Sequence, residues 1–166
     1  VDIEEAQQEA SEDVQAQREE ALAKVLAEQK RKKQRLVDPL QFEMSIKAED
    51  LSNYVPAFGW EMAPPTEKQI KALEKMDINP AAVDNAGKAS LLLNRLKKRR
   101  DEGLASPKQI RQLEQRGFKN VASWSWEQAR RLIDRIAANG WKTPRDIQPA
   151  LYRPPIIESG NGELDW

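Results

Sequence analysis

The sequence predicts an all-α fold from its composition, a long stretch of helix-forming residues and an internal repeat. Charged residues make up 33% of the chain and hydrophobic residues 39%, with 7 glycines in 166 residues, which is typical of a helical, highly solvated protein. Residues 2–35 contain no glycine or proline and are rich in residues of high helix propensity. Residues 66–136 contain two copies of one helix–loop–helix unit, offset by 40 residues.

Residue types that are missing limit the chemistry of the chain. It has no cysteine and no histidine, which excludes disulfides, thiolate metal sites and every Ser-His or Cys-His catalytic pair. It also has no glycine-rich phosphate loop and no Asp-Glu metal box, so we expect no catalytic residue, metal site or cofactor in this chain. No apolar run approaches the roughly 18 residues of a membrane span, and we expect a cytoplasmic protein without a membrane partner. Because the sequence starts at Val1 rather than methionine, we expect a piece of a longer polypeptide.

The part of the chain before the repeat divides into two segments. In residues 1–35 the apolar side chains form only a thin stripe and no heptad pattern persists, which predicts a solvated helical connector rather than a coiled coil. Residues 36–65 begin with a short helix, because Asp38-Pro39 is a typical N-cap followed by proline at the first helical position. The rest of this segment is predicted to be irregular and contains three aromatic residues, Tyr54, Phe58 and Trp60.

Each copy of the repeat has the residues that typically begin its helices. Thr66 and Ser106 are the expected N-caps of the first helices, and each is followed three residues later by a glutamine that completes a capping box. The second helices are expected to begin after Asn85 and Ser125, which are again favourable N-caps. Nine of 31 aligned positions are identical, namely Lys68/Lys108, Gln69/Gln109, Ile70/Ile110, Leu73/Leu113, Glu74/Glu114, Ala82/Ala122, Ala89/Ala129, Leu92/Leu132 and Arg95/Arg135.

The two copies are expected to share one core, because a single short unit buries too little apolar surface to be stable alone. The second helices have apolar faces with the spacing i, i+3, i+4, i+7, formed by Ala89, Leu92, Leu93 and Leu96 and by Ala129, Leu132, Ile133 and Ile136. We predict repeat one over residues 66–105 and repeat two over residues 106–142, packed on each other, with the 36–65 segment and Trp141 completing the core. An extended C-terminal tail is predicted over residues 143–166.

Basic charge is concentrated in the repeats. Residues 66–145 have 18 basic and 9 acidic side chains, whereas the whole chain has no net charge. An excess of this kind suggests a polyanion partner, because Lys and Arg on helix faces neutralise phosphates and release counterions. We predict that nucleic acid contacts Lys68, Lys71, Gly87, Lys88, Arg95, Lys97, Lys98, Arg99, Arg100, Lys108, Arg111, Arg130, Arg131 and Arg135. The alternative is an ordinary solvated face with i,i+4 ion pairs such as Glu67–Lys71.

The starts of the two second helices are further candidates for this contact. Asn85-Ala-Gly-Lys88 places backbone N–H groups and a lysine where a phosphate is favoured. The pattern resembles the SAP-type helix-extended-helix DNA-binding module, in which a glycine and a lysine open the second helix; the alternative is an ordinary N-cap. Trp124 and Trp126 flank the equivalent start in repeat two, where they would stack on bases if exposed, or would fill a small core or an interface.

Four stretches of the sequence resemble a known family: Leu36-Val-Asp-Pro-Leu-Gln-Phe-Glu-Met-Ser, Ala48-Glu-Asp-Leu, Gly59-Trp-Glu-Met-Ala-Pro-Pro-Thr-Glu-Lys-Gln and Asn85-Ala-Gly-Lys-Ala-Ser. They are similar to the C-terminal region of phage and prophage DEAD/DEAH-type superfamily-two helicases, whose ATP-dependent core is followed by a tail with this Lys-Gln-Ile repeat. The resemblance covers residues 36 to 153. It implies ATP-driven translocation or strand separation on nucleic acid in a bacterial host cell, with ATP and Mg bound by a core of the same polypeptide. None of the ATPase motifs lies in this chain, so no catalytic or nucleotide-binding residue is transferred.

Charge and resemblance together lead us to expect a nucleic-acid-binding accessory domain of such a helicase, which contacts the DNA backbone through Lys and Arg helix faces. The alternative is a protein-interaction module that docks a replication or recombination partner through Trp124, Trp126 and the aromatic 54–60 segment. Exposed aromatics together with basic side chains paired to carboxylates would favour this alternative. A third possibility is a structural tail that stabilises the helicase core.

Overall fold

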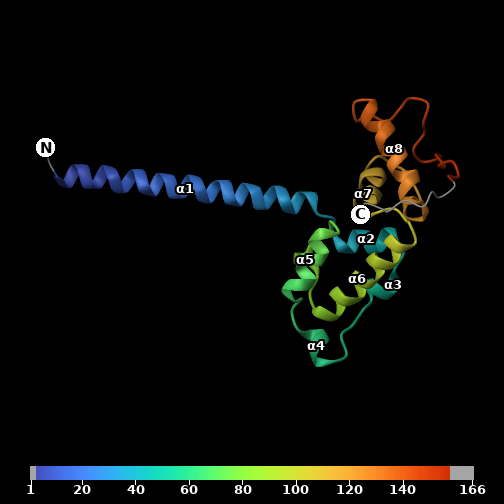
Figure 1. The fold of residues 1–166 in the computed structure, drawn as a ribbon, viewed down its shortest axis with the longest axis horizontal. Coiled ribbons are helices and arrows are strands. Elements are labelled where there is room, and N and C mark those ends of the chain that lie inside the picture. Colours follow the sequence, from blue (N-terminus) through green and yellow to red (C-terminus); the bar gives the residue numbers. More distant parts are fainter. Residues whose placement is uncertain (1–2, 158–166) are drawn as a thin grey trace. The chain divides into compact units, whose positions relative to one another are not determined.

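The computed structural model describes residues 3–157, and the chain divides after Arg35 into two units (Figure 1). The first unit is a single helix, α1 (Ile3–Arg35). Every α1 side chain whose burial is described is exposed, so this helix depends on its own backbone hydrogen bonds and on high helix propensity. Residues 3–157 contain helices and only two isolated β-bridges, with no strand, which confirms the predicted all-α fold.

The second unit contains seven further α-helices within the described residues. They are α2 (Pro39–Ser45), α3 (Glu49–Ser52), α4 (Gly59–Met62), α5 (Glu67–Lys75), α6 (Ala86–Asp101), α7 (Pro107–Gln115) and α8 (Trp126–Ala138). A 3-10 turn precedes the second helix of each repeat: η1 (Pro80–Ala82) and η2 (Val121–Ser123). Residues 143–157 form turns and irregular chain, and the part of the predicted tail after residue 157 lies outside the described residues.

The repeat is a structural unit whose key residue is a glutamine. In repeat one, the Gln69 backbone N–H donates to the Thr66 hydroxyl (3.2 Å) and the Gln69 side-chain oxygen accepts from the Thr66 N–H (3.0 Å), which is the predicted capping box. The side-chain amide of Gln69 also donates to the Ala86 carbonyl at the start of α6 (3.1 Å). One side chain therefore joins the first turns of both helices of the repeat.

Repeat two has the same network 40 residues later. Gln109 forms the capping box with Ser106, and its amide donates to the Trp126 carbonyl at the start of α8 (3.2 Å). The predicted second-helix N-caps, Asn85 and Ser125, are also confirmed, since each side chain accepts a backbone N–H of the first turn. The conservation of this geometry between copies shows that the sequence repeat encodes a repeated arrangement of helix starts.

The core is continuous through both repeats. Leu73, Leu92 and Leu96 of repeat one are fully buried, as are Leu113 and Ile136 of repeat two. Leu92, Leu96 and Ile136 are positions that the i, i+3, i+4, i+7 spacing of the second helices predicted for the core.

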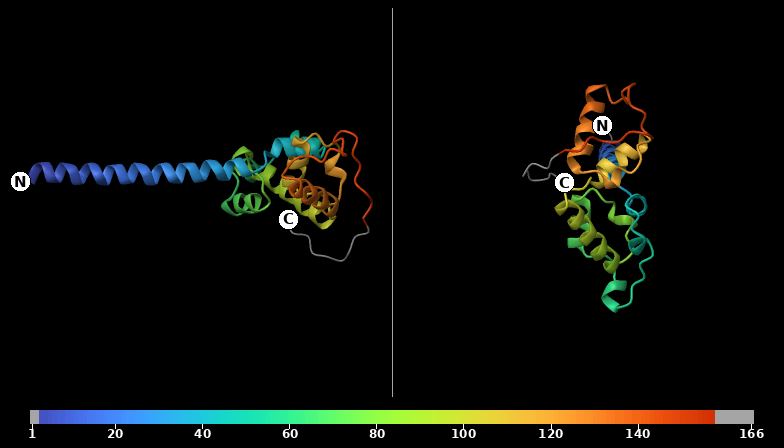
Figure 2. Two further views of the ribbon diagram at one scale, coloured as in Figure 1. Left: turned by 90° about the horizontal axis from the view of Figure 1, so that it is seen from above. Right: turned by 90° about the vertical axis from the view of Figure 1, so that its right-hand side faces the viewer.

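The helix α2 lies between the two repeats, which form separate lobes (Figures 1 and 2). It packs against α7 of repeat two and η1 of repeat one. Val37, just before α2, donates its N–H to the Asp77 carbonyl (2.6 Å), whereas Ser45 at its end donates to the Glu114 carboxylate (2.7 Å). The repeats also contact each other directly, since the Trp126 N–H donates to the Gly103 carbonyl (2.8 Å) and the Ala105 N–H to the Trp124 carbonyl (3.0 Å). The short helix α2 therefore adds to the packing between the repeats.

Trp141 does not complete the core as predicted, since 55% of it is exposed. Gly140 and Trp141 both have positive φ (66° and 62°), so the chain reverses direction immediately after α8. The aromatic residues that do pack in repeat two are Trp124, Phe118 and Tyr152, whose rings meet edge to face.

We predict that Gln109→Ala lowers the free energy of unfolding of the second unit by about 1–2 kcal/mol, because it removes a capping box and the bond between α7 and α8. Urea unfolding followed by tryptophan fluorescence measures this change. Gln115→Ala is the matched control, since Gln115 lies on the same helix, is exposed and belongs to no cap. Equal midpoints for the two variants would contradict the importance of the glutamine.

Candidate nucleic-acid interface

The predicted basic residues fall into two groups when the atoms that surround their cations are compared. In one group the cation contacts groups of the protein itself. These residues are Lys88, Arg95, Arg99, Arg100, Arg111, Arg130, Arg131 and Arg135. In the other group the side chain extends into solvent. The distinction matters because a cation already paired with a carboxylate adds little net attraction for phosphate.

Lys88 belongs to the interior of repeat one. Its ammonium lies 2.9 Å from the carboxylate of Glu43 on α2, which is only 2% exposed, and it also donates to the Leu51 carbonyl of α3. Lys88 thus fixes α2 and α3 onto α6. It is not placed to reach a phosphate, contrary to the prediction that it lies on an exposed basic stripe.

The start of α6 is closed by the segment that contains α4. A Cβ added at Gly87 would overlap the Tyr54 hydroxyl and lie 2.8 Å from the Glu61 Cβ, so glycine is required for this close approach. The Ala86 N–H donates to the Ala63 carbonyl (2.7 Å), and the Lys88 N–H donates to Asn85 (2.8 Å). The predicted SAP-like phosphate site at this helix start is therefore occupied by the chain itself.

Arg99 is also internal, although it lies in the Lys97–Arg100 run. It is 8% exposed, and its guanidinium donates to the carbonyls of Ala105 (3.2 Å) and Ala122 (2.9 Å). The guanidinium carbon lies 6.0 Å from the centre of the Phe42 ring on α2. Burial lowers the pKa of Arg99 from its ordinary value. The basic run is therefore divided: Lys97 and Lys98 are exposed, whereas the side chain of Arg99 is buried.

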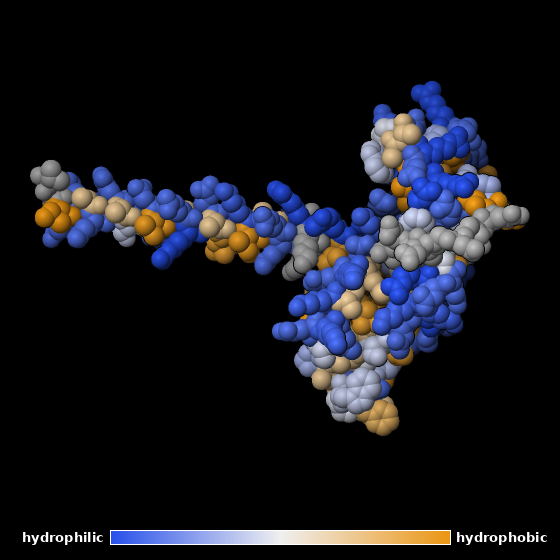
Figure 3. All heavy atoms as spheres, in the orientation of Figure 1, coloured by the Kyte–Doolittle hydropathy of each residue, from blue (hydrophilic) through white to orange (hydrophobic). Residues whose placement is uncertain are grey.

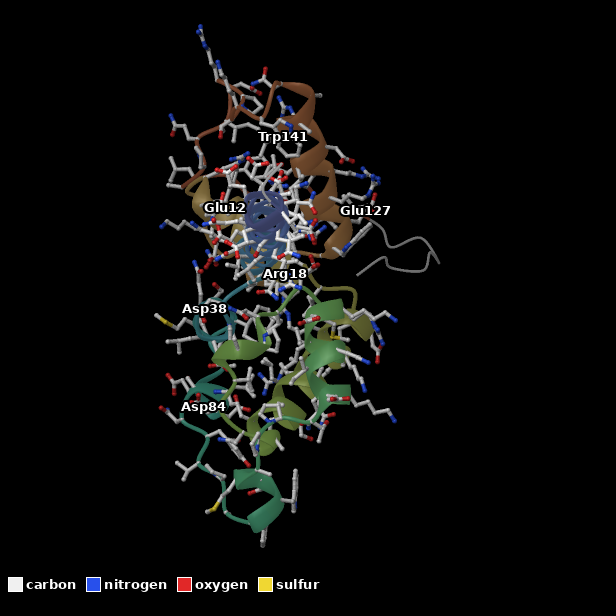
Figure 4. All side chains as sticks on the ribbon, turned by 90° about the vertical axis from the view of Figure 1, so that its left-hand side faces the viewer. Glu12, Arg18, Asp38, Asp84, Glu127 and Trp141 are labelled. Carbon is white, nitrogen blue, oxygen red and sulfur yellow. The ribbon has the colours of Figure 1, made fainter. Side chains whose placement is uncertain are left out.

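The arginines at the surface of the repeats are paired with carboxylates. The equivalent residues Arg95 and Arg135 each lie 2.7 Å from an aspartate, Asp50 and Asp146 respectively. At the start of α8, Glu127 lies 2.5 Å from Arg130 and 3.3 Å from Arg131, and the hydrogen bond from Arg130 holds the pKa of Glu127 below its usual range. Figure 4 shows where Glu127 lies. Such exposed pairs stabilise the fold little, but they neutralise the arginine charge locally.

The residues with solvated cations are on α5, on the last turns of α6 and at the start of α7. They are Lys68, Lys71, Lys97, Lys98 and Lys108, together with Lys75. Arg100, at the end of the same run, belongs instead to the first group, because it is partly buried and lies 3.8 Å from the carboxylate of Asp101.

The lysines of α5 form the clearest basic surface. Lys68, Lys71 and Lys75 are exposed and lie on one face of the helix, opposite the fully buried Leu73 (the α5 basic face). Within residues 3–157 no carboxylate lies within 4.0 Å of these ammonium groups, so the alternative Glu67–Lys71 ion pair is not formed. Hydrophilic side chains cover α5 in the space-filling view (Figure 3).

The equivalent face of α7 is used differently. Arg111 corresponds to Lys71, and its guanidinium donates to the Leu36 carbonyl (3.0 Å) just before α2. Lys108 is exposed, and α2 packs on the neighbouring side of α7, where Ser45 donates to Glu114. The two faces therefore differ chiefly at one position, because Arg111 is bonded to the segment before α2 whereas Lys71 is exposed.

The two tryptophans predicted as base contacts, Trp124 and Trp126, differ in how far they are buried. Trp124 is 5% exposed and packs against Phe118 and Tyr152, so it is a core residue. Trp126 is partly buried, with the Arg130 guanidinium 5.8 Å from the centre of its ring. The exposed aromatic residues of the irregular segment are Phe58 and Trp60, at 66% and 60%. The aromatic content of the sequence singled out this segment, but it did not predict which of its rings would be exposed.

Comparison of the chain with models of protein families, with curated proteins and with solved structures finds no match. Among residues 3–157, no helix combines the length and apolar character needed to cross a membrane. The carboxylates within the same range form no cluster suited to a metal ion.

We predict that Lys88→Met destabilises the second unit by about 3 kcal/mol or more, because it leaves the buried Glu43 carboxylate without its counter-charge. The double variant Glu43→Leu/Lys88→Met should recover most of the loss, since both charges are then removed together. Denaturant unfolding monitored by tryptophan fluorescence gives the three values, with Lys97→Met as the exposed control on the same helix. A Lys88→Met protein as stable as Lys97→Met would show that the pair is unimportant.

Proposed function

We propose that this chain is a nucleic-acid-binding accessory module whose α5 basic face contacts backbone phosphates. The observation on which this rests is that Lys68, Lys71 and Lys75 share one exposed helix face without a carboxylate partner among the described residues. Of the basic residues in the repeats, these three form the densest set whose charge is not balanced within the fold. Lys97 and Lys98, near the end of α6, would add to the attraction.

The binding expected from such a face is electrostatic. Each lysine that neutralises a phosphate releases condensed counterions, so affinity falls steeply as salt rises. Contacts of this kind position a protein on the backbone but do not read bases, so binding should depend little on sequence. We expect DNA to be the natural polyanion, in keeping with the resemblance to phage-type helicase tails.

In this proposal the module is the accessory part of an ATP-dependent helicase, and it holds DNA in position relative to the motor. The resemblance of residues 36 to 153 to the C-terminal region of such helicases supports this role. ATP and Mg would be bound by the core of the same polypeptide, and the basic face would supply affinity rather than chemistry. The protein-docking alternative loses one of its anchors, because Trp124 is buried, but the exposed Phe58 and Trp60 and the arginines paired with carboxylates fit it. The α5 lysines, which have no carboxylate partner among the described residues, favour a polyanion instead.

We predict that Lys68→Ala/Lys71→Ala/Lys75→Ala weakens DNA binding about tenfold at low salt and reduces the slope of log affinity against log salt by about two, because up to three phosphate contacts are lost. Fluorescence anisotropy of labelled DNA at several salt concentrations measures both quantities. The control is Lys119→Ala/Lys142→Ala/Arg145→Ala, which changes the net charge equally at other exposed positions.

Two results would contradict this proposal. One is the absence of binding by the unmodified chain at low salt. The other is an equal loss of affinity in the two triple variants, which would show a response to net charge instead of a defined face.

A further inference from the structure

The segment around α4 exposes four large apolar side chains within eight residues. They are Val55, Phe58, Trp60 and Met62 (the aromatic tip), and each is at least 60% exposed. Side chains of this segment project beyond the ribbon at the far end of the repeat-one lobe (Figure 4). Single exposed apolar residues are common on proteins, but a contiguous group of this kind marks a contact site.

The aromatic tip is held in place by defined interactions. The Glu61 carboxylate accepts hydrogen bonds from the backbone N–H groups of Ala57 (2.6 Å) and Phe58 (3.0 Å), and thereby caps α4. These donors hold the pKa of Glu61 below its ordinary value. Behind the tip, α4 packs on α6, and Tyr54 lies against Gly87. The exposed rings are thus presented on an ordered support, which limits the entropy lost when they bind.

Basic and aromatic surfaces are adjacent along the chain. Four residues separate the end of α4 from the start of α5, where the α5 basic face begins at Lys68. Both α4 and α5 pack against α6, and α4 lies at the end of the lobe in Figure 1 and in the right-hand view of Figure 2. Cations that track a phosphate backbone next to exposed aromatic rings are the combination used to bind single-stranded nucleic acid.

We propose that the aromatic tip stacks on unpaired bases, chiefly through Phe58 and Trp60, so that this module takes single-stranded nucleic acid. The inference rests on the proposed function and adds strand preference to it. A duplex buries the faces of its bases, so the tip would find no stacking partner there, whereas the α5 basic face contacts phosphates in either form. The lysines of the α5 basic face favour nucleic acid over a protein as the partner of the tip, because a nucleic-acid strand supplies a phosphate with every base.

The test compares three labelled probes of equal length with the full chain: oligothymidylate, an abasic phosphodiester strand and a duplex. By fluorescence anisotropy, the unmodified chain should bind oligothymidylate about tenfold more tightly than the abasic strand. Phe58→Ala/Trp60→Ala should remove this difference and leave the abasic affinity unchanged. Trp141→Ala removes an exposed tryptophan elsewhere and is the control, and equal unfolding midpoints establish that the variants are folded.

The outcomes separate this inference from the proposed function. If Phe58→Ala/Trp60→Ala binds oligothymidylate as the unmodified chain does while the lysine variant is weakened, base stacking is wrong and phosphate binding stands. Tighter binding of duplex than of oligothymidylate also overturns the inference. If no probe binds at low salt, the proposed function itself fails. If light scattering shows that the tip variant loses self-association without a change in DNA affinity, the tip binds a second copy of the chain and not bases.

Discussion

The buried guanidinium of Arg99 joins the three parts of the second unit. It donates to a carbonyl in the link between the repeats and to another in η2, and it lies over the Phe42 ring of α2. Hydrogen bonds from a charged donor each contribute about 1.5–3 kcal/mol, and the loss of such a donor leaves buried carbonyls unsatisfied. The relation between the lobes depends on this cation, on α2 and on two backbone hydrogen bonds, from the Ala105 N–H to the Trp124 carbonyl and from the Trp126 N–H to the Gly103 carbonyl.

The electrostatics of the chain follow from how its cations are distributed between interior and surface. The excess of positive charge in residues 66–145 suggests a large basic surface, yet Lys88 and Arg99 stabilise the interior and several surface arginines are paired. The net charge of a segment therefore overstates the attraction that a polyanion would experience. What decides the interaction is the smaller set of lysines whose ammonium groups remain solvated, and these are most closely spaced on α5.

Local features of the fold could be predicted from the sequence, whereas the partners of its cations could not. The caps at Thr66 and Ser106 depend on residues three positions apart, and the buried leucines follow the helical period. Both features can therefore be predicted from a short stretch of sequence. The burial of Lys88 depends on Glu43, which lies 45 residues earlier on another helix. Likewise, nothing local distinguishes the buried Trp124 from the exposed Trp141, because the difference arises from how the chain turns after α8.

The position of α2 has a consequence for how the two repeats can evolve. The repeat has two equivalent first helices, but α2 packs on α7, where the Arg111 guanidinium donates to the Leu36 carbonyl. Substitutions at Arg111 are constrained by the contact that helps to hold the lobes together. The corresponding position on α5, Lys71, is exposed and makes no such contact, so the fold constrains substitutions there less. A single asymmetric contact thus ties one copy of the repeat to the scaffold and leaves the equivalent position of the other copy open to substitution.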